Sequence, residues 1–204
     1  MATKTLTIVV LFIIAITSIY STCKKGGLGC ANTVYDFKIS VHAYPDKDSI
    51  RIGDTIWFEV NAPTTLKDKG TNSLINYSGT ENLGSAIGFE KIINSTTFKS
   101  STNTFTYKLI TGEETQNANP TLIKEYLFKE QSGNYVFKLG VIPKEIGIFG
   151  IVFSNATNVY RNIDKCTKAS FEINFDSTNQ HYYLNPNFQG GPTPIGGDYY
   201  FRVY

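Results

Sequence analysis

Residues that often carry enzyme chemistry are scarce in this chain of 204 residues. The two histidines, His42 and His181, are far apart, and neither has a serine or cysteine partner in a known motif. No Gly-x-Ser-x-Gly turn is present to expose a nucleophilic serine. Two imidazoles and three cysteines at these spacings also do not match a metal site. We therefore expect no catalytic residue, no metal and no cofactor.

Three aspartates, Asp46, Asp48 and Asp54, are close enough in sequence to suggest a calcium loop. Such a loop needs a longer acidic ladder that ends in a bidentate glutamate, which is missing. Aspartates next to Pro45 and Gly53 are typical of tight turns. We interpret all three as turn residues.

Aromatic side chains are the better candidates for a binding surface. The alternation of Ile56, Phe58 and their neighbours places Trp57 on the outward face of a strand, where an indole can stack on a sugar or anchor a partner. Tyr199 and Tyr200, in an aromatic-rich tail, are further candidates for ligand contact. Two alternatives stay open: the long segment 63–84 covers Trp57, and the tail tyrosines pack within a sheet.

The start of the chain reads as a secretion signal. Lys4 precedes an almost unbroken apolar run over residues 6–16, which is followed by Thr17 and Ser18. A membrane-spanning helix needs about 20 apolar residues, so this run is too short to span. The pattern predicts a leader that is removed during export.

Residues 20–26 (YSTCKKG) resemble the signal of a bacterial lipoprotein, in the form found in the Bacteroidota. The departure is Tyr20, where an aliphatic residue is usual. The resemblance implies cleavage before Cys23, acylation of its thiol and attachment to membrane lipid. Because no acidic residue follows Cys23 directly, it also implies the outer membrane, with the leaflet undetermined. The alternative is a soluble secreted or periplasmic protein.

Acylation of Cys23 would leave Cys30 and Cys166 as one pair, 136 residues apart (166 − 30). In an oxidising envelope these two can form a disulfide, with a stabilisation of up to about 5 kcal/mol from the chain-entropy argument. The alternative is two buried or free thiols.

Composition limits the partners. Removal of 22 residues from 204 leaves 182, enough for one domain with a core. Loss of Lys4 reduces Lys and Arg from 19 to 18 against 17 acids, so the net charge is near +1 and a nucleic-acid partner is not expected. The 13 tyrosines and 14 phenylalanines favour strands over helices.

Periodicity predicts an all-β domain of about eight short strands. Apolar and polar residues alternate in most segments, turn residues separate them, and no helical period or repeat appears. Uneven spacing and irregular loops favour an antiparallel β-sandwich over a closed barrel. The predicted strands lie within 34–43, 50–52, 55–60, 87–93, 104–110, 122–130, 135–141, 147–153, 169–175 and 198–204; the segments 63–84 (loop or weak hairpin) and 155–165 (loop) lie between strands.

Two further resemblances support this fold. Residues 49–57 (SIRIGDTIW) are similar to the A′–B region of immunoglobulin-like domains in bacterial surface proteins. Residues 164–187, through DKC, NQHY and NPN, are similar to uncharacterised Bacteroidota lipoproteins. Together they imply an immunoglobulin-like sandwich and no particular activity. The Cys…Trp…Cys spacing of antibody domains is absent.

We therefore expect a lipoprotein signal peptide (1–22), a lipid-anchored Gly-rich tether (23–33) and a β-sandwich domain (34–204). The function favoured by these features is a non-enzymatic binding or scaffolding module of the cell envelope, with a protein or glycan partner. The alternative is a carbohydrate-binding accessory lipoprotein that uses exposed aromatics. A β-sandwich hydrolase comes third, because a fold does not fix a function.

Overall fold

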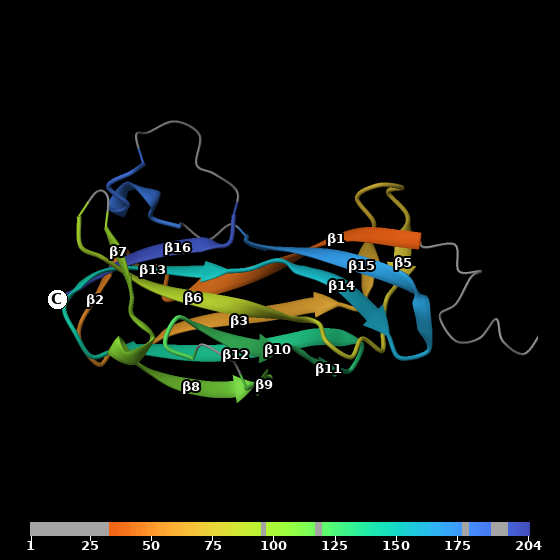
Figure 1. Cartoon of the computed structure of the whole chain (residues 1–204), viewed down its shortest axis with the longest axis horizontal. Coiled ribbons are helices and arrows are strands. Elements are labelled where there is room, and N and C mark those ends of the chain that lie inside the picture. Colours follow the sequence, from red (N-terminus) through yellow and green to blue (C-terminus); the bar gives the residue numbers. More distant parts are fainter. Residues whose placement is uncertain (1–32, 95–96, 117–119, 177–179, 189–195) are drawn as a thin grey trace, which may run out of the picture.

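The computed structural model describes residues 33–94, 97–116, 120–176, 180–188 and 196–204. Within these residues the chain forms two seven-stranded sheets and a separate two-stranded hairpin (Figure 1). The predicted all-β sandwich is therefore confirmed. The signal segment, Cys23 and Cys30 lie outside the described residues. No helix in the described part is both long and apolar enough to span a bilayer.

Sheet I has the strand order β11-β12-β3-β1-β15-β14, and β8 pairs with the same edge of β12 as β11. Its strands are β1 (Thr33–Tyr44), β3 (Ile56–Pro63), β8 (Phe105–Thr111), β11 (Lys129–Gln131), β12 (Asn134–Pro143), β14 (Ala156–Arg161) and β15 (Asp164–Phe175).

Sheet II has the order β2-β16-β13-β6-β10-β9, and β7 also pairs with β6. Its strands are β2 (Ser49–Ile50), β6 (Gly84–Ile92), β7 (Phe98–Ser100), β9 (Glu113–Glu114), β10 (Ile123–Leu127), β13 (Gly147–Phe153) and β16 (Asp198–Val203). The separate hairpin is β4 (Thr65–Lys67) with β5 (Leu74–Asn76), and two short 3-10 turns are η2 (Thr102–Thr104) and η3 (Tyr182–Leu184).

The order of the principal strands is that of an immunoglobulin constant-type sandwich, with A-B-E-D in one sheet and C-F-G in the other. In chain order β1, β3, β6, β8, β12, β13 and β16 take the places of A to G. The short β2 leaves the first sheet and pairs in parallel with β16, next to the G position. The segment 49–57, likened above to an A′–B region, covers β2 and the start of β3. The described residues form sixteen strands, about twice the predicted number. Besides these eight principal strands there are eight more, which include the twelve-residue β15.

One addition, the hairpin β14–β15, extends sheet I beyond β1. β15 runs parallel to β1, with Thr33 opposite Thr167. The prediction of a loop over 155–165 was wrong, because β14 occupies Ala156–Arg161. Two register shifts interrupt its pairing with β15. Because a strand with such shifts does not keep a regular alternation of buried and exposed residues, β14 could not be recognised from its sequence.

The core lies between the sheets and consists mainly of aromatic and β-branched side chains. In β1 the inward residues Phe37, Ile39, Val41 and Ala43 are all at most 1% exposed, as the alternation predicted. Burial of each large apolar side chain contributes about 1.5–3 kcal/mol. The segment 63–84 contains the β4–β5 hairpin, which agrees with the hairpin alternative for this stretch.

Candidate functional site

Trp57 belongs to a row of side chains that crosses the outer face of sheet I. It is paired with Tyr44 of β1 on one side and with Gly140 of β12 on the other, and Gly140 is paired with Lys108 of β8. Directly paired residues point to the same face of a sheet. The neighbours of Trp57 on β3, Ile56 and Phe58, are fully buried in the core, so Trp57 points outward as predicted.

Gly140 leaves the space in which the indole lies. A Cβ atom at this glycine would be only 2.8 Å from Cζ3 of Trp57 and 3.0 Å from Cγ2 of Thr55. The indole therefore lies across the glycine and is half-buried against the sheet. The segment 63–84 was predicted to cover Trp57. Its β4–β5 hairpin packs beside β1 instead, and the indole packs at Gly140 of β12.

Two lysines flank the indole. The Nζ atoms of Lys108 and Lys138 are 5.8 and 5.5 Å from the centroid of the Trp57 ring. Lys138 is also 5.2 Å from the ring of Tyr44. Cation–π contacts of this length contribute about 0.5–1 kcal/mol at exposed sites. The hydrogen bond with Tyr44 and the nearby Glu59 carboxylate raise the pKa of Lys138, so its positive charge persists at neutral pH.

One carboxylate balances part of this charge. Glu59 lies 3.4 Å from Lys138 Nζ and accepts a hydrogen bond of 3.1 Å from the Tyr44 hydroxyl. Lys108 has no carboxylate within ion-pairing distance among the described residues. His42, on the same face, stacks on Tyr44 at 5.9 Å and lies 3.4 Å from Asp176. The row can therefore stack a flat ring and attract an anion.

Tyr199 and Tyr200 of the tail do not belong to an exposed surface. Tyr199 is fully buried and Tyr200 is 7% exposed, which contradicts their prediction as ligand contacts. Tyr199 packs against Phe58 in the core, with ring centroids 5.6 Å apart. Tyr200 points to the outer face of sheet II, where Tyr182 of η3 packs on it at 5.4 Å. β16 is thus covered on both faces at Tyr199 and Tyr200.

The three aspartates predicted to lie in turns all contact other protein groups. Asp48 accepts hydrogen bonds from the hydroxyls of Ser49 and Tyr183, and these bonds lower its pKa. Asp54 accepts a bond of 2.9 Å from the backbone N–H of Arg51. Asp46 lies 3.5 Å from Nε2 of His181. The contact of Asp54 with Arg51 is that of a turn residue. Asp46 and Asp48 also contact His181 and Tyr183 at η3, which the turn interpretation did not include.

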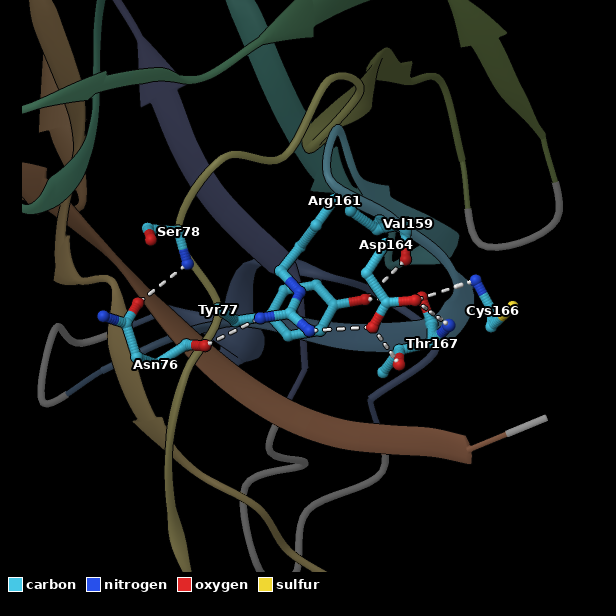
Figure 2. Close-up of polar contacts among 8 residues, drawn as sticks. All are labelled: Asn76, Tyr77, Ser78, Val159, Arg161, Asp164, Cys166 and Thr167. Atoms are coloured by element: carbon cyan, nitrogen blue, oxygen red, sulfur yellow. Dashed lines mark hydrogen bonds and ion pairs between the residues drawn. The ribbon is translucent and has the colours of Figure 1, made fainter. Parts of the chain in front are cut away.

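A polar cluster at the opposite end of the domain was missed from sequence. Figure 2 shows Arg161 and Asp164 joined by an ion pair of 2.9 Å beside Tyr77. The Tyr77 hydroxyl lies 2.9 Å from the carbonyl oxygen of Val159 and 3.2 Å from that of Thr167. The guanidinium carbon of Arg161 is 5.2 Å from the Tyr77 ring centroid. Burial raises the pKa of Tyr77 to about 12.

Asp164 organises the start of β15 in this cluster. It accepts hydrogen bonds from the Thr167 hydroxyl and from the backbone N–H groups of Cys166 and Thr167. These bonds lower the pKa of Asp164 to about 2. Asp164 lies two residues before Cys166, whose backbone N–H it binds, and this spacing is typical of an aspartate in a turn. The aspartate could therefore have been recognised from the sequence. The partners of the Asp164 carboxylate come from the protein itself, so we interpret the cluster as structural.

Cys166 lies at the start of β15, next to the start of β1. Thr33 pairs with Thr167, so the chain three residues beyond Cys30 is adjacent to the residue after Cys166. The formation of a Cys30–Cys166 bond and the acylation of Cys23 stay predictions, because Cys23 and Cys30 lie outside the described residues.

No protein-family model, curated protein or solved structure matches this chain. The assignment of a function therefore depends on the surface of the domain, and the Trp57 row is the site on it that the sequence also indicated.

Proposed function

We propose that the protein is a lipid-anchored envelope protein whose sandwich domain is a binding module for acidic glycans. The observation that carries the proposal is the Trp57 indole, which packs over Gly140 with the Nζ atoms of Lys108 and Lys138 5.8 and 5.5 Å from its ring centroid. Tyr44, Trp57, Gly140 and Lys108, with Lys138 beside them, make up the Trp57 row.

The chemistry of the row suits a sugar chain with carboxylate or sulfate groups. An aromatic ring can stack on the apolar face of a sugar, and an ammonium group forms charge-assisted hydrogen bonds with an anion. Glu59 neutralises part of the charge near Lys138, whereas Lys108 is exposed at the edge of the row. A flat outer face suits an extended chain better than a small molecule, which prefers a concave site.

The position of the row also suits an anchored module. β1 begins at Thr33, where the predicted tether ends, and Tyr44 of the row is its last residue. Eleven residues of strand at about 3.3 Å each place the row about 36 Å from the tether. A lipid anchor on Cys23 would thus present the row away from the membrane.

A glycan array tests the binding proposal. We expect the wild-type domain to bind uronic-acid-containing or sulfated glycans, the Trp57→Ala variant to lose this binding, and the Tyr204→Ala variant, which alters an aromatic 61% exposed elsewhere, to keep it. Equal binding by wild type and Trp57→Ala, or no binding by wild type, would contradict the proposal. Membrane fractionation of Cys23→Ala tests the anchor: the variant should be found in the soluble fraction, and unchanged membrane association would reject lipidation.

A further inference from the structure

A small cavity lies on the outer face of sheet II, on the other side of the sandwich from the Trp57 row. It has a volume of about 230 Å³ and lies between β6, β7 and β10. Apolar side chains of Phe98, Leu122 and Ile123 line it together with Gly88, Ser100 and Glu90. Typical ligand pockets measure about 300–1,000 Å³, so this cavity suits a small group or the end of a side chain.

Among the described residues, Glu90 is the only charged one that lines this cavity. It is paired with Ser100 of β7 on one side and with Gly150 of β13 on the other. The adjacent Phe89 is fully buried in the core, so Glu90 points to the outer face. Burial raises the pKa of Glu90, and the Asp198 carboxylate raises it further.

The two glycines beside Glu90 differ in what fills their space. At Gly150 a Cβ atom would be 3.0 Å from Cε1 of Tyr200, so the tyrosine ring already occupies that side. At Gly88 the nearest atom would be Cβ of Val152 at 3.8 Å, so the surface there is open. The cavity therefore opens next to Glu90 on the Gly88 side.

The carboxylate of Glu90 has no hydrogen bond or ion pair with another side chain among the described residues. The next residue, Lys91, is engaged elsewhere: its Nζ is 3.0 Å from Glu145 and 5.6 Å from the Phe149 ring. A half-buried carboxylate without a partner is unfavourable, and a bound cation would relieve this. Perturbed carboxyl groups in a cavity are candidates for ligand contact.

We propose that this cavity binds a primary ammonium group on a short apolar stem, with Glu90 as its anionic partner. The ammonium would form a charge-assisted hydrogen bond with the carboxylate, and the stem would pack on Phe98, Leu122 and Ile123. The same chemistry is found in free alkylamines and in the lysine side chains of a protein partner. This site is separate from the Trp57 row and does not depend on the proposed glycan binding.

The test is a titration of the whole domain in which the NMR chemical shifts of the β6 and β7 amides report binding. The probes are n-butylammonium, its matched neutral and anionic analogues n-butanol and butyrate, and Nα-acetyl-lysine methyl amide. We expect n-butylammonium to bind at least about tenfold more tightly than n-butanol, since charged hydrogen bonds contribute about 1.5–3 kcal/mol. A preference for the lysine derivative would identify a protein partner as the source, and a preference for the free amine a small molecule.

The Glu90→Gln variant should lose this preference and keep the same melting temperature or a higher one, because the variant removes an unpartnered carboxylate. Glu125→Gln is the matched control, because Glu125 is a half-buried glutamate on β10 that does not line the cavity. Binding should weaken as the pH falls through the raised pKa of Glu90, because the neutral acid cannot pair with an ammonium. Equal affinity for n-butanol and n-butylammonium, unchanged binding by a folded Glu90→Gln variant, or no binding to wild type would overturn the proposal.

Discussion

Trp57 on β3 and Gly140 on β12 are directly paired, and the missing side chain of the glycine makes room for the indole. The indole therefore packs against the sheet at this glycine. The surface that we propose for binding therefore depends on a residue without a side chain as much as on its aromatic and basic neighbours.

Replacement of Gly140 by alanine should displace the indole. Its Cβ would lie 2.8 Å from Cζ3 of Trp57, and such overpacking costs about 1–3 kcal/mol. This cost exceeds the stabilisation of about 0.4–1 kcal/mol that a Gly→Ala change can bring by restricting the unfolded chain. We expect a lower midpoint of urea denaturation and a red shift of the emission of the single tryptophan. Gly88→Ala, with no atom closer than 3.8 Å, is the control. It should leave the tryptophan emission unchanged and the urea midpoint the same or slightly higher; the same result for Gly140→Ala would contradict the described packing.

Lys108 should contribute to affinity through its charge. Lys108→Gln should weaken binding of an acidic glycan about two- to fivefold at low salt, since exposed ionic contacts contribute up to about 1 kcal/mol. The loss should shrink as the salt concentration rises, because salt screens exposed charges. Calorimetry at two salt concentrations measures both effects. Lys129→Gln on β11 is the matched control, because it alters another exposed lysine of sheet I outside the row. Equal losses in the two variants would mean that only the overall charge matters.

The predicted Cys30–Cys166 disulfide is compatible with the register of β1 and β15. Thr33 and Thr167 are paired, and three residues of chain from Cys30 to Thr33 are long enough to return a cysteine to Cys166. Loss of the bond in Cys166→Ser should lower the free energy of unfolding by up to about 5 kcal/mol. Mass spectrometry of the non-reduced mature protein after alkylation checks the bond directly. Two alkylated thiols would reject it.

Asp164 should make stability depend on acid pH. Its pKa is lowered from 3.8 to about 2 in the folded protein, so folding favours the ionised form. This contribution is present above the unfolded pKa and is lost as the pH falls through about 2. Asp164→Asn should therefore reduce stability at pH 7 and make little difference near pH 2, as measured by urea denaturation across that range. The same loss at both pH values would show that the charge of Asp164 is not responsible.

Much of the fold could be predicted from local sequence pattern. Strict alternation in β1 and at the start of β3 identified which side chains face the core, including the outward direction of Trp57. β14 was missed because an edge strand with register shifts has no regular alternation. Alternation also cannot show what covers an outer face, which is why Tyr200 was expected to be exposed although η3 packs on it.

The candidate site was only partly predictable for the same reason. Trp57 could be found because aromatic type and alternation are local properties. Its relation to Tyr44, Gly140 and Lys108 depends on the register of four strands, and those strands come from distant parts of the chain. Glu90 was not singled out, because its apolar surroundings on the outer face of sheet II also form only in the folded domain.

The most direct test of the binding proposal uses Trp57 itself, because it is the single tryptophan and its fluorescence reports contact at the row. The wild-type domain would be titrated with an oligogalacturonate and a sulfated oligosaccharide, with maltohexaose as the neutral control, while calorimetry follows binding in parallel. We expect a saturable change in tryptophan emission with an acidic ligand, at the same midpoint as the heat signal, and a weaker response to maltohexaose. Binding in calorimetry without a change in Trp57 emission, or no binding of either acidic ligand, would contradict the binding proposal.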